Sequence, residues 1–438
     1  MNNNVLSIEK RIDEIVSLHN KGLFDEALKK TNILNKENPN NPLVFNAYGI
    51  IYASLEDFEK SIDCFSNAID LEPKYIKAHN NLGNILTYLG KFKEASECYS
   101  NIIKLKPDYA EGYFNLGKTQ HYIGKLEQSI DNYTKAIELK KNYTEAIENL
   151  IKILTYHNPG KKNKNSYVLT NQILQLNNLN FNSEKKISDN EVTAFFQKCN
   201  DIVTKNIDYL STNEVQIYRK NTYKFNCERH LEVFDTYNAI PENCFSCYKV
   251  QIVLKTVMEL FKLYFVFDNL NLKNNNTRKC MIELRPDILS AYKGYVYCRS
   301  LDEANNIKDQ LEKILEKTIV NNFIIKVKRG CTEFGMSYPE YKDPEKNMKY
   351  NEKWRSKEKI VDEKLNKRDI SAKIVLTKNI MGTTIRDILI MRNWLGYAKK
   401  VGDYSYKKIF ENTTISPTIE KRLADQLLNR SREFDSVS

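Results

Sequence analysis

A spacing of 34 residues in the first third of the chain constrains its fold more than any other feature. Four classes of residue keep this spacing. They are the glycines Gly49, Gly83 and Gly117, the prolines Pro39, Pro73 and Pro107, the small residues Ala27, Ser61, Ala95 and Ser129, and the aromatics Phe65, Tyr99 and Tyr133. Self-similarity at this period is typical of units that bury their apolar faces against one another. The period therefore predicts a stack of helical hairpins.

The chemistry of these positions fits such a hairpin. Small residues such as Gly83 and Ala95 let two helices approach closely, and large residues such as Tyr99 fill the space between neighbouring hairpins. Proline ends the second helix because it cannot continue the hydrogen-bond ladder. The stretch AHNNLGNILTYLGKFKEASECYSNIIKLKPDY, residues 78–109, resembles the tetratricopeptide repeat (TPR). The resemblance covers residues 8–157 and implies repeats at about 8–41, 42–75, 76–109 and 110–143, followed by a capping helix over 144–157.

The TPR resemblance also implies a right-handed superhelix whose concave groove, lined by the first helix of each hairpin, binds a protein or peptide. Asn81, Asn115 and Asn149 occupy one position of successive repeats, where a side-chain amide offers both donor and acceptor to a peptide backbone. Lys118 adds polarity to the groove without completing the carboxylate clamp of chaperone-binding TPRs. Ala47 interrupts the ladder, and asparagine is also simply the consensus residue there. Both interpretations of the asparagines stay open.

Charge and composition separate the two halves of the chain. Residues 1–157 carry 19 Lys and Arg against 21 Asp and Glu, a net charge of −2, so the remainder carries +13 and the whole chain +11. Any attraction to an acidic partner therefore belongs to the second half. The N-terminal MNNNVLSIEKR has no apolar core of a signal peptide, and no apolar run is long enough to span a bilayer. We therefore expect a cytoplasmic protein with no membrane contact, in which the nine cysteines are thiols or metal ligands.

The second half predicts a different architecture. Strand and helix patterns over residues 247–331 follow the order β-α-β-β-α-β of a ferredoxin-like sandwich, which makes the whole chain an α+β multidomain protein. The remaining boundaries are also predicted. A linker covers 158–190, a helix and an irregular cysteine and histidine segment cover 191–246, helices cover 332–410, and a mobile tail covers 411–438.

Alternation along the predicted strands places basic and aromatic residues on the outer face of the sheet. They are Lys293, Tyr295, Tyr297, Lys326 and Lys328. The third strand, KGYVYC, partly resembles the K-G-F-G-F-V signature of RNA-recognition motifs, which implies stacking of bases on the two tyrosines. Val296 replaces a small residue of the signature, and the first strand lacks its exposed aromatic. RNA binding is accordingly an alternative function.

Cys227-x2-His230 and Cys244-x2-Cys247 are two chelating pairs separated by thirteen residues. Their number and type fit one structural zinc ion. The strand order expected for the sandwich brings Cys331, at the end of the last predicted strand, beside the start of the first strand, where it is a candidate to substitute for or supplement one of the four ligands. Two other interpretations stay open. The cysteines serve as small buried apolar residues, or Cys244 and Cys247 act in an enzyme or thiol redox protein with His230 as base.

Catalysis has little other support in the sequence. The chain contains no GxxxxGK[ST], no GxGxxG after a strand and no GxSxG, which argues against P-loop, dinucleotide-binding and α/β-hydrolase enzymes. The favoured function is therefore a non-enzymatic adaptor. The sequence does not define its oligomeric state.

Overall fold

The computed structural model describes residues 2–160, 163–177, 181–207, 210–219, 227–285, 288–319, 323–331, 333–344, 346, 348–367, 382–424, 427, 430, 432 and 434. The chain forms two compact units, the first ending at Leu150 and the second, here called the C-terminal unit, containing most of the remainder. The part of the predicted tail at 435–438 lies outside the described residues.

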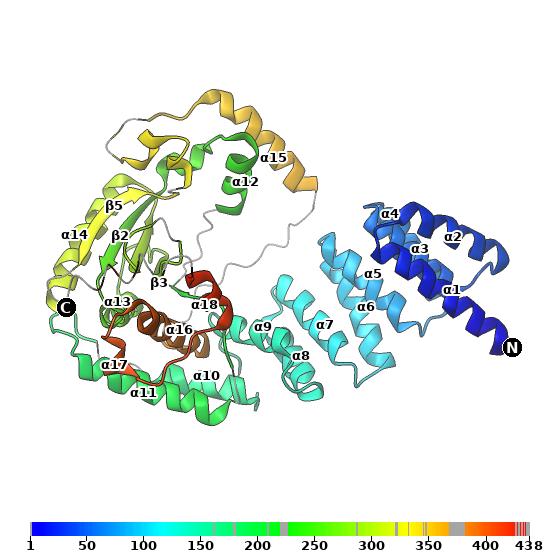
Figure 1. Cartoon of the computed structure of the whole chain (residues 1–438), viewed down its shortest axis with the longest axis horizontal. Helices are drawn as coiled ribbons and strands as arrows, with labels where there is room; N and C mark the ends of the chain where they lie inside the picture. Colours follow the sequence, from blue (N-terminus) through cyan, green and yellow to red (C-terminus); the bar gives the residue numbers. More distant parts are fainter. Residues whose placement is uncertain are drawn as a thin grey trace. The chain divides into compact units, whose positions relative to one another are not determined.

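The first unit is a series of antiparallel helical hairpins, here called the repeat array (Figure 1). Each proline of the 34-residue period lies two residues beyond the second helix of a hairpin, as its missing N–H requires. The helices are α1 (Asn2–Asn20), α2 (Phe24–Glu37), α3 (Pro42–Ser54), α4 (Phe58–Leu71), α5 (Ile76–Tyr88), α6 (Phe92–Leu105), α7 (Ala110–Tyr122), α8 (Leu126–Leu139) and α9 (Thr144–Leu154). The boundary between the units falls within α9.

The small residues of the period bring the two helices of each hairpin into contact. A Cβ atom on Gly83 would lie 2.8 Å from Cζ of Tyr99, so any larger residue would push the buried ring away. The hydroxyl of Ser61 donates to the carbonyl of Gly49 across the hairpin at 2.8 Å. The period therefore selects small residues for two reasons, which are close packing and a hydrogen bond between helices.

The C-terminal unit contains a sheet and several helices. The strands are β1 (Gln216–Arg219), β2 (Tyr248–Leu254), β3 (Arg278–Ile282), β4 (Tyr292–Cys298) and β5 (Ile324–Arg329). The α-helices are α10 (Ser166–Leu176), α11 (Asp189–Asn206), α12 (Cys227–Tyr237), α13 (Val257–Asn269), α14 (Leu301–Thr318), α15 (Arg355–Lys367), α16 (Ile385–Val401), α17 (Tyr406–Ile409) and α18 (Pro417–Leu423). Short 3₁₀ turns include η1 (Glu242–Ser246) and η2 (Glu333–Gly335).

The five strands form one antiparallel sheet in the order β1-β3-β4-β2-β5. Val250 of β2 pairs with Val296 on one side and Val327 on the other. Helices α13 and α14 pack against the sheet and against each other (Figure 1). A Cβ atom on Gly294 would collide with Leu263, so glycine at this point of β4 lets α13 approach closely.

The structure departs from the sequence prediction within the segment expected to be a linker. Helix α10 lies there, and its Val168 and Leu174 are fully buried. The Asn171 side chain donates to the carbonyl of Leu154 and accepts from the amide of Ile385. Because these contacts satisfy buried backbone groups, part of 158–190 belongs to the folded C-terminal unit.

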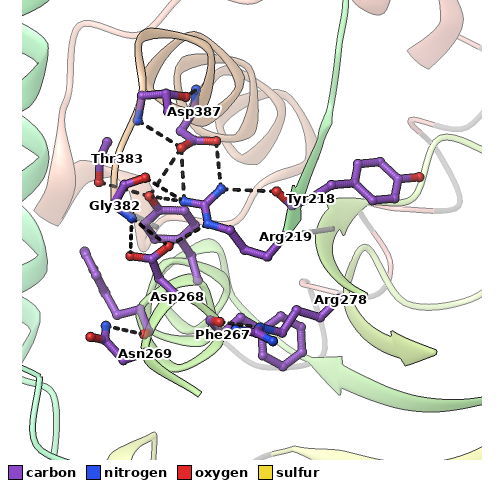
Figure 2. Close-up of polar contacts among 12 residues, drawn as sticks. Tyr218, Arg219, Phe267, Asp268, Asn269, Arg278, Gly382, Thr383 and Asp387 are labelled. Atoms are coloured by element: carbon purple, nitrogen blue, oxygen red, sulfur yellow. Dashed lines mark hydrogen bonds and ion pairs between the residues drawn. The ribbon is translucent and has the colours of Figure 1, made fainter. Parts of the chain in front are cut away.

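A buried arginine joins three elements of the C-terminal unit (Figure 2). Arg219, at the end of β1, donates from Nε to Asp268 Oδ1 at 2.5 Å and from Nη2 to Asp387 Oδ2 at 3.1 Å. Asp387 also accepts from the amide of Thr384 and so completes a capping box at the start of α16. The arginine itself is only 6% exposed. Its ion pairs therefore connect β1, α13 and the N-terminus of α16 in a region with little water.

Arg278 of β3 ends helix α13 in a similar way (Figure 2). Its guanidinium donates to the carbonyls of Phe267 at 2.5 Å and Leu270 at 3.0 Å. These carbonyls have no partner within the helix, and a cation at a helix C-terminus is favourable. Among the residues that the structure describes, no helix is long and apolar enough to cross a membrane.

Candidate functional site

The asparagines of the predicted ladder bond to one another across neighbouring repeats. Asn81 of α5 donates to Asn46 Oδ1 of α3 at 2.9 Å, and Asn115 of α7 donates to Asn80 Oδ1 of α5 at 3.1 Å. Each bond occupies one of the two N–H groups of the donating amide. The accepting asparagines, Asn46 and Asn80, also share the 34-residue spacing but are not among the residues predicted from the repeat pattern.

Asn149 does not continue this series. The residue at the accepting position of the preceding repeat is Phe114, which offers no side-chain oxygen. The amide of Asn149 instead donates to the carbonyl of Glu145 in its own helix at 2.7 Å. The three asparagines predicted as equivalent therefore make two kinds of contact.

A hollow of about 420 Å³ opens between α5, α6 and α7. Its polar and aromatic lining contains both Asn115 and Lys118. The full lining is Asn84, Thr87, Tyr88, Gly90, Phe92, Tyr99, Asn115, Lys118, Thr119 and Tyr122. The Tyr99 hydroxyl donates to Asn84 Oδ1 at 2.7 Å, which holds these two lining side chains in place. Tyr88 is 64% exposed. The hollow thus combines a cation, amides and accessible aromatic surface.

The predicted metal ligands come from three segments of the C-terminal unit. Cys227 begins α12 and His230 lies one turn later, whereas Cys244 lies within the 3₁₀ turn η1 and Cys247 follows that turn just before β2. The amide of Gly330 donates to the carbonyl of Cys247 at 2.8 Å, which places Cys331 close to Cys247 at one end of the sheet. The cysteine that the sequence offers only as an additional candidate thus lies with the others.

Contacts among these thiols change their acidity. Hydrogen bonding with the Cys331 thiol raises the pKa of Cys227. Contact with Cys227 lowers the pKa of Cys331, but contact with the Cys244 thiol and burial outweigh it and raise that pKa. Burial raises the pKa of Cys247 to about 11. The thiols of Cys227, Cys247 and Cys331 are therefore protonated at neutral pH, which disfavours the nucleophilic role that a redox enzyme would need.

His230 is buried near this cluster. It is 5% exposed, burial lowers its pKa, and its Nε2 has no hydrogen-bond partner among the residues that the structure describes. Within the described ranges, no group of three or more His, Cys, Asp or Glu side chains is positioned to hold a metal ion as it stands.

The predicted outer face of the sheet needs a correction. Lys293 is 1% exposed and Tyr295 7% exposed, so neither is the accessible residue that the strand alternation predicts. Lys293 instead contacts Glu283 at 3.3 Å, and Lys249 and Lys279 lie 5.2 and 5.4 Å from the ring centroid of Tyr295. The alternation identifies a second face but does not show that other segments bury it.

The other members of the predicted nucleic-acid face are less buried. Tyr297 and Lys328 are half-buried, and Lys326 on the edge strand β5 is exposed. Burial outweighs the attraction of Glu283 and lowers the pKa of Lys293 to about 8, and burial also lowers the pKa of Lys279 to about 8. Part of the positive charge is therefore held inside the unit.

The described fold and the periodic groove define a helical-repeat protein. Residues 49–87 and 83–124 match the family model described as TPR repeat, and residues 110–143 match the model described as Tetratricopeptide repeat. The repeat array therefore consists of TPR repeats, and the matched residues contain Asn80, Asn81 and Asn115.

Three solved structures are similar to the array. The crystal structure of MamA has 23% sequence identity, covers 31% of this chain and 80% of its own, and has a TM-score of 0.30. MamA from Desulfovibrio magneticus RS-1 has 21% identity, covers 33% and 82%, and has a TM-score of 0.31. The first TPR of Spaghetti (RPAP3), bound to the HSP90 peptide SRMEEVD, has 26% identity, covers 26% and 90%, and has a TM-score of 0.25. No curated protein matches the chain.

Proposed function

We propose that the protein is a non-enzymatic adaptor whose repeat array binds a protein or an extended peptide in its groove. The observation that carries this proposal is the hollow between α5, α6 and α7, where Asn115 and Lys118 face the same space as Tyr88 and Tyr122. Amides bond a peptide backbone, and aromatic surface accepts an apolar side chain. This combination suits a peptide better than a small polar metabolite.

The hollow also indicates which peptide would bind. Lys118 is the only charged residue among its lining side chains, so one acidic group of the peptide is expected next to it. RPAP3 in its solved complex binds an HSP90 peptide. This chain lacks the full set of basic residues that clamp a terminal carboxylate, and we therefore propose an internal acidic residue as the recognised group.

Binding to an immobilised library of short random peptides tests the proposal. We expect the full chain to retain peptides that pair an acidic residue with an apolar one. Lys118→Glu should weaken their binding about tenfold, or ~1.4 kcal/mol, because attraction becomes repulsion. Lys135→Glu is the matched control, since Lys135 lies on α8 outside the hollow and is exposed.

Circular dichroism of both variants checks that the helices are retained. The proposal is wrong if the wild-type chain retains no peptide, or if Lys118→Glu and Lys135→Glu weaken binding equally.

For the C-terminal unit we propose a ferredoxin-like module that binds a second ligand of unknown identity. The order β2-α13-β3-β4-α14-β5 along the chain and β5-β2-β4-β3 in the sheet supports this classification. RNA binding and thiol redox chemistry are the alternatives. The burial of Lys293 and Tyr295 and the raised pKa of Cys247 weigh against them. The cytoplasm remains the proposed location.

A further inference from the structure

Backbone pairing brings Cys247 next to Gly330, the residue that precedes Cys331. Tyr248 of β2 pairs with Arg329 of β5, so the residues just outside this pair, Cys247 and Gly330, meet at the end of the sheet. A Cβ atom on Gly330 would collide with Cys247 Sγ. The glycine therefore leaves room for that sulfur beside the backbone that leads into Cys331.

The CxxC turn is held in place beside them. The amide of Cys247 donates to the carbonyl of Cys244 at 3.2 Å, within the 3₁₀ turn. The hydroxyl of Tyr341 donates to the same carbonyl at 2.9 Å from the far side. Cys244 is buried, so its thiol is confined within the unit.

Helix α12 contributes the remaining thiol. Cys227, His230 and Phe234 recur at three- and four-residue spacing, so they share one face of the helix. The ring centroids of Phe234 and Phe334 lie 4.5 Å apart. Phe334 belongs to η2, which begins shortly after Cys331. This contact turns the face that carries Cys227 and His230 toward Cys331. The thiol contacts from Cys331 to Cys227 and to Cys244 agree with that placement.

We propose that Cys227, Cys244, Cys247 and Cys331 bind one Zn²⁺ ion as four thiolates, with the buried Nε2 of His230 donating a hydrogen bond to one of them. This set exchanges His230 for Cys331 relative to the four ligands that spacing alone predicts. Zinc takes four such ligands in a tetrahedron, and an outer hydrogen bond to a ligand is common. It also gives the unpartnered Nε2 a partner.

Binding would release the four thiol protons and leave a zinc–thiolate group of charge −2. Lys249 lies near Cys331 and Cys247, is 8% exposed, and would offset part of this charge. Because the side chains do not form a finished site in the described structure, the thiols must close around the ion by rotation of their side chains.

Metal analysis and Zn²⁺ titration of the full chain, purified without chelator, test the proposal. We expect one zinc per chain and release of protons during titration of the metal-free protein. Co²⁺ in place of Zn²⁺ should give the intense absorption of tetrahedral thiolate coordination. Cys331→Ser should weaken Zn²⁺ binding by more than about 100-fold, and His230→Ala by only about 10- to 100-fold, as expected for an outer partner.

Cys199→Ser is the matched control, because Cys199 is a buried cysteine of α11 away from the cluster. Protection of the four thiols by Zn²⁺ against alkylation, read by mass spectrometry on the wild-type chain, does not depend on any variant folding. Absence of bound zinc and of protection after exposure to Zn²⁺ would overturn the proposal. Equal affinity of wild type and Cys331→Ser, or loss of all binding in His230→Ala, would overturn the assigned ligand set.

Discussion

The repeat array and the C-terminal unit are each stabilised internally by polar contacts, and the sequence separation of the bonded residues differs greatly between the two. In the array, Asn81 bonds to Asn46 across 35 residues, and Asn115 bonds to Asn80 across the same separation one repeat later. In the C-terminal unit, Arg219 bonds to Asp387 across 168 residues and has no periodic equivalent. Contacts in a repeat protein act between neighbours, whereas the buried node joins three segments at once. The array should therefore tolerate single losses that the C-terminal unit does not.

The largest effect is expected at the buried node. Arg219→Met would leave the carboxylates of Asp268 and Asp387 without their cation in a buried site, at a cost of roughly 3–5 kcal/mol. Both tryptophans, Trp354 and Trp394, belong to the C-terminal unit, so their fluorescence during denaturation reports this unit alone.

Arg355→Met is the control for this change, since Arg355 is about half exposed and its ion pairs lie at the surface. It should cost less than ~1 kcal/mol. The unfolding transition of the array, followed by far-ultraviolet circular dichroism, should stay unchanged in both variants. Equal destabilisation by the two variants would contradict it.

Acid should weaken the C-terminal unit through Glu283. Burial works to raise its pKa, but the hydrogen bond from Arg285 and the charge of Lys293 outweigh this and lower the pKa from 4.5 to about 2. A carboxyl group whose pKa is lower in the folded state stabilises the fold above its unfolded pKa. That contribution disappears as pH falls from 4.5 toward 2.

The measurement is the unfolding free energy of wild type minus that of Glu283→Gln, followed by tryptophan fluorescence between these pH values. The difference should shrink as pH falls. A difference that does not change with pH would show that Glu283 is not held as the structure describes.

Close packing within a single hairpin should produce a moderate effect. Gly83→Ala places a methyl group against the buried ring of Tyr99 and should cost about 1–3 kcal/mol in the array. Gly160→Ala is the control, because nothing lies within 4 Å of its added methyl group. A double variant with Tyr99→Leu should be less destabilised than the sum of the single variants. Simple additivity in thermal unfolding would argue against this steric contact.

The smallest effect is expected for the inter-repeat asparagines. Asn81→Ala removes one half-buried hydrogen bond to Asn46 and should lower the stability of the array by about 0.5–1.5 kcal/mol. Asn149→Ala removes only a bond to its own helix and should cost less. Urea unfolding followed by circular dichroism compares the two variants. The reverse order would refute the assignment of Asn81 as the bridging residue.

The sequence predicts the repeat array well because each of its constraints is local. The glycine that must approach Tyr99 and the proline that ends α6 lie within one repeat and recur in the next. Patterns of alternation and helical spacing also locate the strands and helices of the C-terminal unit. The bonds of Asn46 and Asn80 were missed because the consensus marks only one side of each pair.

Ion pairing and burial that depend on contacts between distant segments became visible only in the tertiary structure. No local signal marks Arg219 as the partner of Asp387, although the T-x-x-D capping pattern at Thr384 is visible in the sequence. Strand alternation predicts which face of the sheet carries Lys293 and Tyr295, but it does not predict that this face is buried by other segments. The expected strand order already placed Cys331 beside the first strand of the sandwich, whereas the position of α12 with Cys227 and His230 came only from the tertiary structure. Helices, strands and repeats are determined by patterns among residues close in sequence. Burial and ion pairing depend on segments that are far apart in sequence and meet only in the folded chain.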